Sequence, residues 1–202
     1  MAETTDKQIR RYQLIGLAAM VVGGLTAIAG SLIAHFTGLP ETDALGRDLY
    51  PSIPRGWVPV VIGQIISLSG TFVFLAGICF AFVYKRPLTW ARAALGAFVF
   101  VSVSIILFGI VPNEWLTLTQ SVWEWTPQKI AVTIPPWLVL NNEISVSYAA
   151  VKDIVSGTYA IVVLGGMAVG MYQWQEYQKK VASGPPPQPV STYGRPLSKV
   201  ER

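Results

Sequence analysis

The stretch LIGLAAMVVGGLTAIAGSLIAHF, from Leu14 to Phe36, contains no Asp, Glu, Lys or Arg. A helix needs roughly 20 mostly apolar residues to cross the hydrocarbon core of a bilayer. Because the backbone must satisfy its own hydrogen bonds in lipid, a helix is the expected conformation. The stretch is also longer than the apolar core of a signal peptide, which has about 7–15 residues. It therefore predicts a membrane-spanning helix that the chain retains.

Three further apolar runs follow this first one. The chain of 202 residues is 52% hydrophobic and 13% charged, whereas a soluble domain carries about 25% charged residues. The sequence lacks the short alternating strands of a transmembrane barrel. We therefore predict an all-α membrane protein, a four-transmembrane-helix bundle. Its expected spans are residues 14–36, 60–84, 91–111 and 149–175.

The spans divide the chain into a four-span membrane domain, residues 1–181, and a Pro-rich cytoplasmic tail, residues 182–202. Two outer loops are expected at residues 37–57 and 112–142. The tail contains PxxP and no apolar periodicity, which is typical of polyproline segments.

Basic residues in short loops favour the cytoplasmic side of a membrane. If both termini are cytoplasmic, eleven of the 15 Lys and Arg residues lie on that side. The four on the outer side are then Arg47, Arg55, Lys129 and Lys152. We expect a multi-pass protein of the cell membrane with both termini in the cytoplasm.

Glycine recurs every seven residues in the first two spans, and the fourth span contains a GxxxG motif. These glycines are Gly16, Gly23 and Gly30, then Gly63, Gly70 and Gly77, and finally Gly166 and Gly170. Faces of small residues let helices approach closely in lipid. We predict that these glycines pack helices against one another; the alternative is that glycine is simply common in membrane helices.

The second outer loop contains SVWEWTPQKIAVTIPPWLVLNNE, from Ser121 to Glu143, which is too polar and too rich in proline to cross a bilayer. Upstream of it, Asn113 and Glu114 predict the start of a short amphipathic helix that lies in the outer interface. Pro135 and Pro136 predict an extended segment.

The fourth helix is predicted to run from Glu143 to about Val181, which contains no proline, and to project beyond the membrane at both ends. The large aromatic residues near its outer start are candidates for contact with a partner protein, with anchoring in lipid headgroups as the alternative. These candidates are Trp115, Trp123, Trp125, Trp137 and Tyr148.

The sequence contains few residues that could bind a metal or cofactor. Its single histidine is His35 and its single cysteine is Cys79, whereas haem and redox metals need several such ligands. We therefore predict no catalytic, cofactor-binding or metal-binding residue in this chain alone, and we expect contacts with lipid. A shared ligand or a quinone contact at His35 stays open, and Gln64 is expected to hydrogen-bond another helix, with a substrate contact as the alternative.

Two functional hypotheses remain. The first is a non-catalytic accessory subunit of a multi-subunit bacterial membrane complex, held by larger membrane subunits and lipids. A respiratory or other energy-transducing oxidoreductase is the expected host. The second is a small homo-oligomeric transporter, channel or lipid-handling protein. Clustered Lys and Arg with aromatic platforms are missing, so no nucleic-acid partner is expected.

Overall fold

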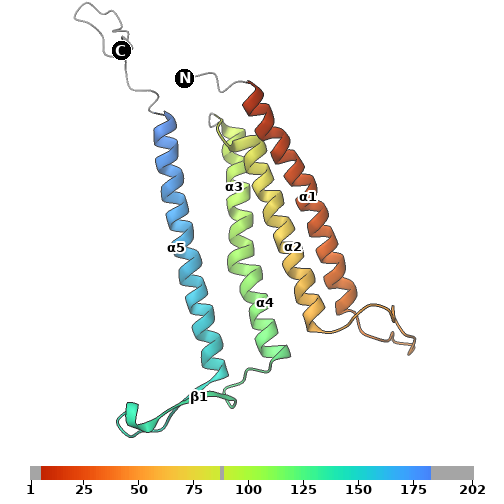
Figure 1. Cartoon of the computed structure of the whole chain (residues 1–202), viewed down its shortest axis with the longest axis vertical. Coiled ribbons are helices and arrows are strands. Elements are labelled where there is room, and N and C mark those ends of the chain that lie inside the picture. The colour runs from red at the N-terminus through yellow and green to blue at the C-terminus, as the bar shows by residue number, and fades with distance from the viewer. Residues whose placement is uncertain (1–5, 87–88, 183–202) are drawn as a thin grey trace, which may run out of the picture.

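The computed structural model describes residues 6–86 and 89–182. Four long helices run side by side in alternating directions (Figure 1). In this described part of the chain, these four are long and apolar enough to cross a membrane. The all-α fold with four membrane-length helices is therefore confirmed, and the chain has the helices of a multi-pass membrane protein. Residues 183–202 of the expected tail lie outside the described residues.

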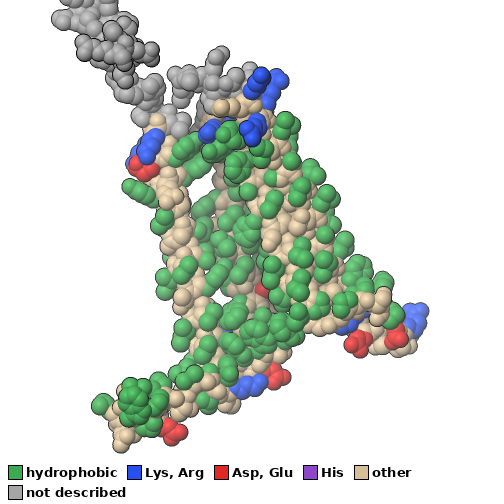
Figure 2. Space-filling model, in the orientation of Figure 1, with side chains coloured by type: hydrophobic (Ala, Val, Ile, Leu, Met, Phe, Trp, Pro, Cys, Tyr) green, Lys and Arg blue, Asp and Glu red, His purple; other side chains and the backbone are tan. Residues whose placement is uncertain are grey.

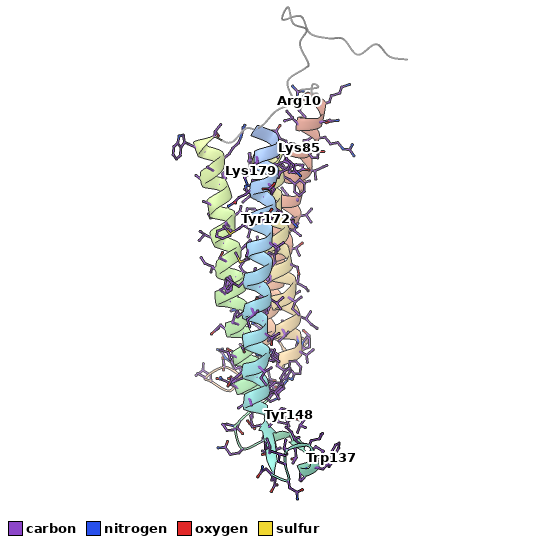
Figure 3. All side chains as sticks on the ribbon, turned by 90° about the vertical axis from the view of Figure 1, so that its left-hand side faces the viewer. Arg10, Lys85, Trp137, Tyr148, Tyr172 and Lys179 are labelled. Carbon is purple, nitrogen blue, oxygen red and sulfur yellow. The ribbon has the colours of Figure 1, made fainter. Side chains whose placement is uncertain are left out.

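The two ends of the molecule differ in charge and shape. Arg10, Lys85 and Lys179 lie at one end, which we call the basic end (Figure 3). Trp137 and Tyr148 lie at the opposite end. We call that end the hairpin end, because the loop after the third helix forms a two-stranded hairpin there (Figure 1).

Helices α1 (Asp6–Gly38) and α2 (Trp57–Ile78) pack backbone against backbone. A Cβ atom added at Gly23 would lie 2.5 Å from the Phe74 nitrogen and 2.6 Å from the Gly70 oxygen. Such distances leave no room for a side chain. One polar contact also crosses this interface, between the hydroxyls of Ser31 and Ser67 at 2.9 Å. The close approach thus depends on the absence of side chains.

The third helix is continuous from Trp90 to Val122. The separate interfacial helix that we expected from Asn113 is therefore wrong, because this segment extends the third helix. The helix has four consecutive parts: α3 (Trp90–Ile105), the π-helical η2 (Ile106–Ile110), α4 (Val111–Thr117) and the π-helical η3 (Leu118–Val122).

Pro112 lies inside this helix without ending it. The Val111 N–H bonds to the carbonyl of Ile106, five residues back, as in a π turn. One residue further along, the Leu107 carbonyl would need an N–H from position 112, and proline has none. In membrane helices, local π turns are one way to accommodate the backbone groups that proline leaves without a partner.

The loop after η3 forms an antiparallel hairpin of β1 (Ile130–Ile134) and β2 (Ile144–Ser147). The extended segment that we expected is thus a strand, and a short 3-10 turn, η4 (Pro136–Leu138), follows it. The start expected for the fourth helix at Glu143 is wrong, because α5 (Tyr148–Ala182) begins after β2. Ile144 pairs with Ile134 instead, as β-branched residues favour.

The three N-terminal helices form the core, while α5 stands apart. Leu75 and Ile78 of α2 are buried together with Ile106 of the third helix. The apolar window of α5, by contrast, has no buried residue. Figure 2 shows openings between α5 and the other helices. The chain therefore folds as a packed three-helix unit plus one helix whose apolar span is exposed.

Candidate functional site

Five aromatic rings meet at the hairpin end, and we call them the aromatic cluster. They are Trp57, Trp115, Trp123, Trp125 and Tyr148. Neighbouring ring centroids lie between 5.2 Å and 6.0 Å apart, within the range in which aromatic pairs attract. The rings come from α2, α4, the loop and α5, so the cluster ties all of these segments together.

Four of the five aromatic residues that we considered for partner contact belong to this cluster. The fifth, Trp137, lies apart at the tip of the hairpin (Figure 3). Its side chain is 76% exposed, and Leu140 beside it is 94% exposed. The tip therefore presents an apolar surface that the described part of the chain does not cover.

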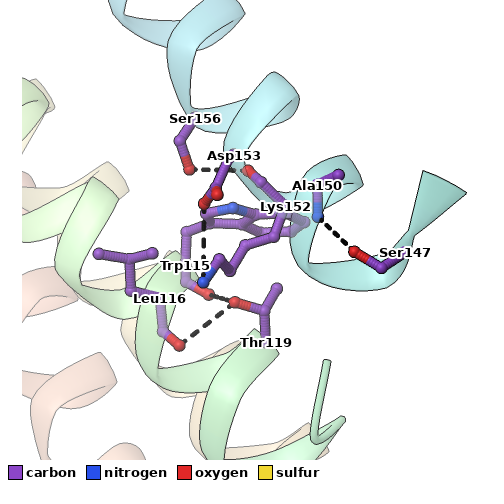
Figure 4. Close-up of polar contacts among 8 residues, drawn as sticks. All are labelled: Trp115, Leu116, Thr119, Ser147, Ala150, Lys152, Asp153 and Ser156. Atoms are coloured by element: carbon purple, nitrogen blue, oxygen red, sulfur yellow. Dashed lines mark hydrogen bonds and ion pairs between the residues drawn. The ribbon is translucent and has the colours of Figure 1, made fainter. Parts of the chain in front are cut away.

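Lys152 of α5 approaches the cluster from one side. Its side chain is only 13% exposed and forms an ion pair of 3.6 Å with Asp153. Figure 4 shows it reaching toward the turn that carries Trp115 and Thr119. Thr119 is fully buried and donates a hydrogen bond to the Trp115 carbonyl at 2.8 Å. Among the described residues, nothing accepts a hydrogen bond from the buried Trp115 Nε1 atom.

A second attachment of α5 lies nearer the middle of the helices. The Tyr159 hydroxyl donates a hydrogen bond to the Leu107 carbonyl at 2.9 Å. That carbonyl is the one whose helical partner position is occupied by Pro112. The interruption in the third helix thus provides the acceptor that holds α5. We had not singled out Tyr159 from the sequence.

The glycines of α5 differ from those of α1 and α2. A Cβ atom added at Gly166 or Gly170 would meet none of the described atoms within 4 Å. Both positions follow Tyr159 at helical spacing, so they share its face of α5. The structure therefore brings the first six predicted glycines together between α1 and α2, and leaves the GxxxG motif of α5 without a partner helix.

Gln64 contacts an acidic residue of the third helix. Its Nε2 atom donates a hydrogen bond of 2.7 Å to Oε2 of Glu114. The sequence predicts Glu114 to lie outside the membrane-spanning helices, and no local pattern pairs it with Gln64. Continuing the third helix past Pro112 would have placed it on a membrane-length helix.

His35 lies near the end of α1, exposed, with its ring 5.3 Å from that of Phe36. Cys79 is half-buried in the π turn η1 (Cys79–Val83) that extends α2. In the described part of the chain, no three residues among His, Cys, Asp and Glu are grouped so that they could hold a metal ion.

Charged groups outside the apolar helices organise the loops. The Arg55 guanidinium donates to the carbonyls of Phe36, Leu39 and Leu49, which closes the first loop onto the end of α1. At the basic end, the Tyr12 hydroxyl accepts a hydrogen bond from Lys85 at 3.3 Å. This contact raises the pKa of Lys85 above its ordinary value.

The site as a whole is an aromatic and apolar surface at the hairpin end, joined to an open face on α5. No protein-family model, curated protein or solved structure matches this chain.

Proposed function

We propose that the chain is a non-catalytic accessory subunit of a multi-subunit membrane complex. The observation that carries the proposal is the open face of α5. The helix is apolar along its span, yet none of that span is buried, and a Cβ atom added at Gly166 or Gly170 would meet no described atom within 4 Å. Helices in lipid associate through faces of this kind. A helix of a larger subunit packing there would complete the bundle.

The hairpin end supports the same proposal. Asp153 and Tyr172 are 19 residues apart on α5, about 28 Å at 1.5 Å per residue, close to the thickness of a hydrocarbon core. Tyr148 and the hairpin then lie beyond the apolar region. An exposed apolar tip in that position suits a protein partner, since large apolar patches outside lipid mark interfaces.

The proposed setting follows from the sequence. A bacterial respiratory or other energy-transducing oxidoreductase is the proposed host, because such assemblies include small membrane subunits that carry no cofactor ligands. The proposed location is the cell membrane with both termini cytoplasmic. The basic residues Arg10, Lys85 and Lys179 gather at the end where α1 begins and α5 ends (Figure 3), which supports this orientation.

The test is recovery of the complex from native membranes through a tag on this chain, compared between Gly170→Leu and Ala168→Leu. Ala168 lies on the opposite side of α5 by helical spacing and is exposed, so it is a matched control. We expect Gly170→Leu to reduce co-purification of larger subunits at least about tenfold, while Ala168→Leu leaves it unchanged. Equal recovery with both variants would contradict the proposal.

A second candidate function is a small lipid-handling protein that acts as a homo-oligomer. The position of Glu114 on a membrane-length helix favours it, because ionisable residues in such helices often mark a ligand path. The same purification distinguishes the two functions. A defined set of larger subunits supports the accessory role, and this chain alone as an oligomer supports the second candidate.

A further inference from the structure

A pocket opens at the hairpin end between α1, α2 and the third helix. Its volume is about 370 Å³, which is within the range of small-molecule sites. Two of its walls are apolar, formed by Val60 and Val61 of α2 and by Leu118 of η3. Arg55, Gln64 and Glu114 supply its charged and amide groups.

The pocket places the carboxylate of Glu114 below the level of the lipid headgroups. Trp57 begins α2, and tryptophan prefers the headgroup region. Gln64 lies seven residues further along, which is about 10 Å at 1.5 Å per residue. Its partner Glu114 is at the same depth, since the two side chains are hydrogen-bonded at 2.7 Å. The carboxylate therefore lies near the edge of the hydrocarbon region, where an ionisable group is costly and usually functional.

The Glu114 carboxylate can accept more hydrogen bonds than it receives from the described residues. An ionised carboxylate accepts several hydrogen bonds through two oxygens. Among the described residues, only Gln64 donates to Glu114, and it reaches only Oε2. Arg55 does not fill this role, because it donates to the carbonyls of Phe36, Leu39 and Leu49 instead. A ligand that offers a hydrogen-bond donor would satisfy the remaining oxygen of Glu114.

The charges of the pocket also restrict the ligand. A phosphate or carboxylate ligand would meet Glu114 and an arginine already engaged with backbone oxygens, so the pocket does not suit an anion. A hydroxyl or ammonium group suits Glu114, and an apolar body suits Val60, Val61 and Leu118. We propose that this pocket binds a membrane-soluble amphiphile through a hydroxyl or ammonium donor to Glu114. This site goes beyond the accessory role and does not depend on it.

The experiment uses the full chain in nanodiscs of phosphatidylcholine, whose headgroup has no hydrogen-bond donor. Three probes are added separately: phosphatidylethanolamine, diacylglycerol and decylubiquinol, with decylubiquinone as the matched probe that lacks hydroxyl donors. Binding is followed by the unfolding midpoint and by tryptophan emission, because Trp57 lines the pocket and its ring lies 5.9 Å from that of Trp123.

We expect at least one donor-bearing probe to raise the midpoint and shift the emission saturably. A response to either lipid identifies a lipid headgroup as the source, and a response to decylubiquinol but not to decylubiquinone identifies a quinol. The site is absent if none of the three donor-bearing probes produces a response, or if decylubiquinone binds as well as decylubiquinol while both lipids fail.

Two variants connect the response to the pocket. Glu114→Gln should weaken binding at least about tenfold, since it replaces a carboxylate acceptor by a neutral amide. The matched control Glu143→Gln removes an exposed carboxylate outside the pocket and should bind as the wild type does. If Glu114→Gln does not fold, Val61→Trp fills the pocket and keeps the carboxylate. Wild-type binding by whichever of the two variants folds would overturn the proposal.

Discussion

The Tyr159 hydroxyl of α5 donates a hydrogen bond of 2.9 Å to the Leu107 carbonyl of the third helix. This bond satisfies a carbonyl that lacks an N–H partner because residue 112 is proline. It joins the helix that stands apart to the packed unit of three helices. Its loss should therefore affect how α5 is held more than how the core packs.

Tyr159→Phe removes only the hydroxyl. We expect a loss of about 1 kcal/mol in the free energy of unfolding, the usual contribution of one hydrogen bond, measured as a lower unfolding midpoint in detergent. Tyr172→Phe is the control, since Tyr172 is 65% exposed. In a Pro112→Ala background the Leu107 carbonyl regains an N–H partner. Tyr159→Phe should then cost less, and an equal cost in both backgrounds would contradict this account.

Adjacent glycines of α1 should respond oppositely to the same substitution. Gly23→Ala places a Cβ atom 2.5 Å from the backbone of Phe74, so we expect destabilisation by about 1–3 kcal/mol, as for other overpacked sites. At Gly24 the nearest atom is in the Phe74 side chain at 3.8 Å. Gly24→Ala should be neutral or slightly stabilising, since alanine stabilises a helix more than glycine does. Equal unfolding midpoints for the two variants would show that α1 and α2 are not in close contact.

Trp123 and Trp137 should separate folding from partner contact. Trp123→Ala removes a ring from the aromatic cluster, so we expect a lower unfolding midpoint for the isolated chain. Trp137→Ala changes a side chain that is 76% exposed and should alter stability by less than about 0.5 kcal/mol. If the hairpin tip contacts a partner, Trp137→Ala lowers recovery of the complex. Wild-type recovery would restrict the interface to α5.

Asp43 should control the shape of the first loop as a function of pH. Its carboxylate accepts backbone hydrogen bonds from Arg47 at 2.9 Å and from Leu45 at 2.8 Å. The backbone bond from Arg47 is the main cause that lowers the pKa of Asp43. A lowered pKa stabilises the folded loop above the ordinary value of about 3.9, and this contribution is lost as the pH falls through the folded pKa.

The amide resonances of Leu45 and Arg47 provide the measurement for Asp43. We expect them to stay at their folded positions as the pH is lowered from 7 to about 4 and to move only below that value. Asp43→Asn removes the titrating carboxyl, so its resonances should not show the change expected for the wild type below about pH 4. A midpoint for Asp43 above the ordinary value would contradict the hydrogen-bonded turn.

Membrane topology can be tested by labelling single cysteines in a Cys79→Ala background. Gln8 lies near the start of α1, and Ser52 lies in the first loop; both are exposed. In intact cells, an impermeant maleimide should modify Ser52→Cys and leave Gln8→Cys unmodified until the membrane is opened. The reverse pattern would invert the proposed orientation.

The features that depend on short-range sequence patterns could be predicted from the sequence. Runs such as Leu14–Phe36 predict helices from apolar length, and the glycines at positions 23 and 70 fall on the faces that meet in the structure. The hairpin was missed because its strands are short, and Ile144 continues smoothly into the helical pattern that begins at Tyr148.

Other features depend on contacts that no local pattern records. Gln64 and Glu114 are 50 residues apart in the chain. Because proline usually ends a helix, Pro112 led to the prediction that Glu114 lies outside the third helix. The bond from Tyr159 to Leu107 likewise could not be predicted from a local sequence pattern. It requires an unpaired carbonyl that appears only when the π turn is known.

The π turn from Ile106 to Ile110 has a consequence for how this chain tolerates insertions and deletions. A π turn accommodates one residue more than an α-helical turn, and each residue rotates an α-helix by about 100°. Deleting one residue there would leave hydropathy and span length almost unchanged. Such a deletion would convert the π turn to an α-helical turn and keep Glu114 facing Gln64. The same deletion within α3 would instead rotate Glu114 away from Gln64 and Trp115 away from the aromatic cluster, so the π turn is the place where the third helix tolerates the loss of a residue.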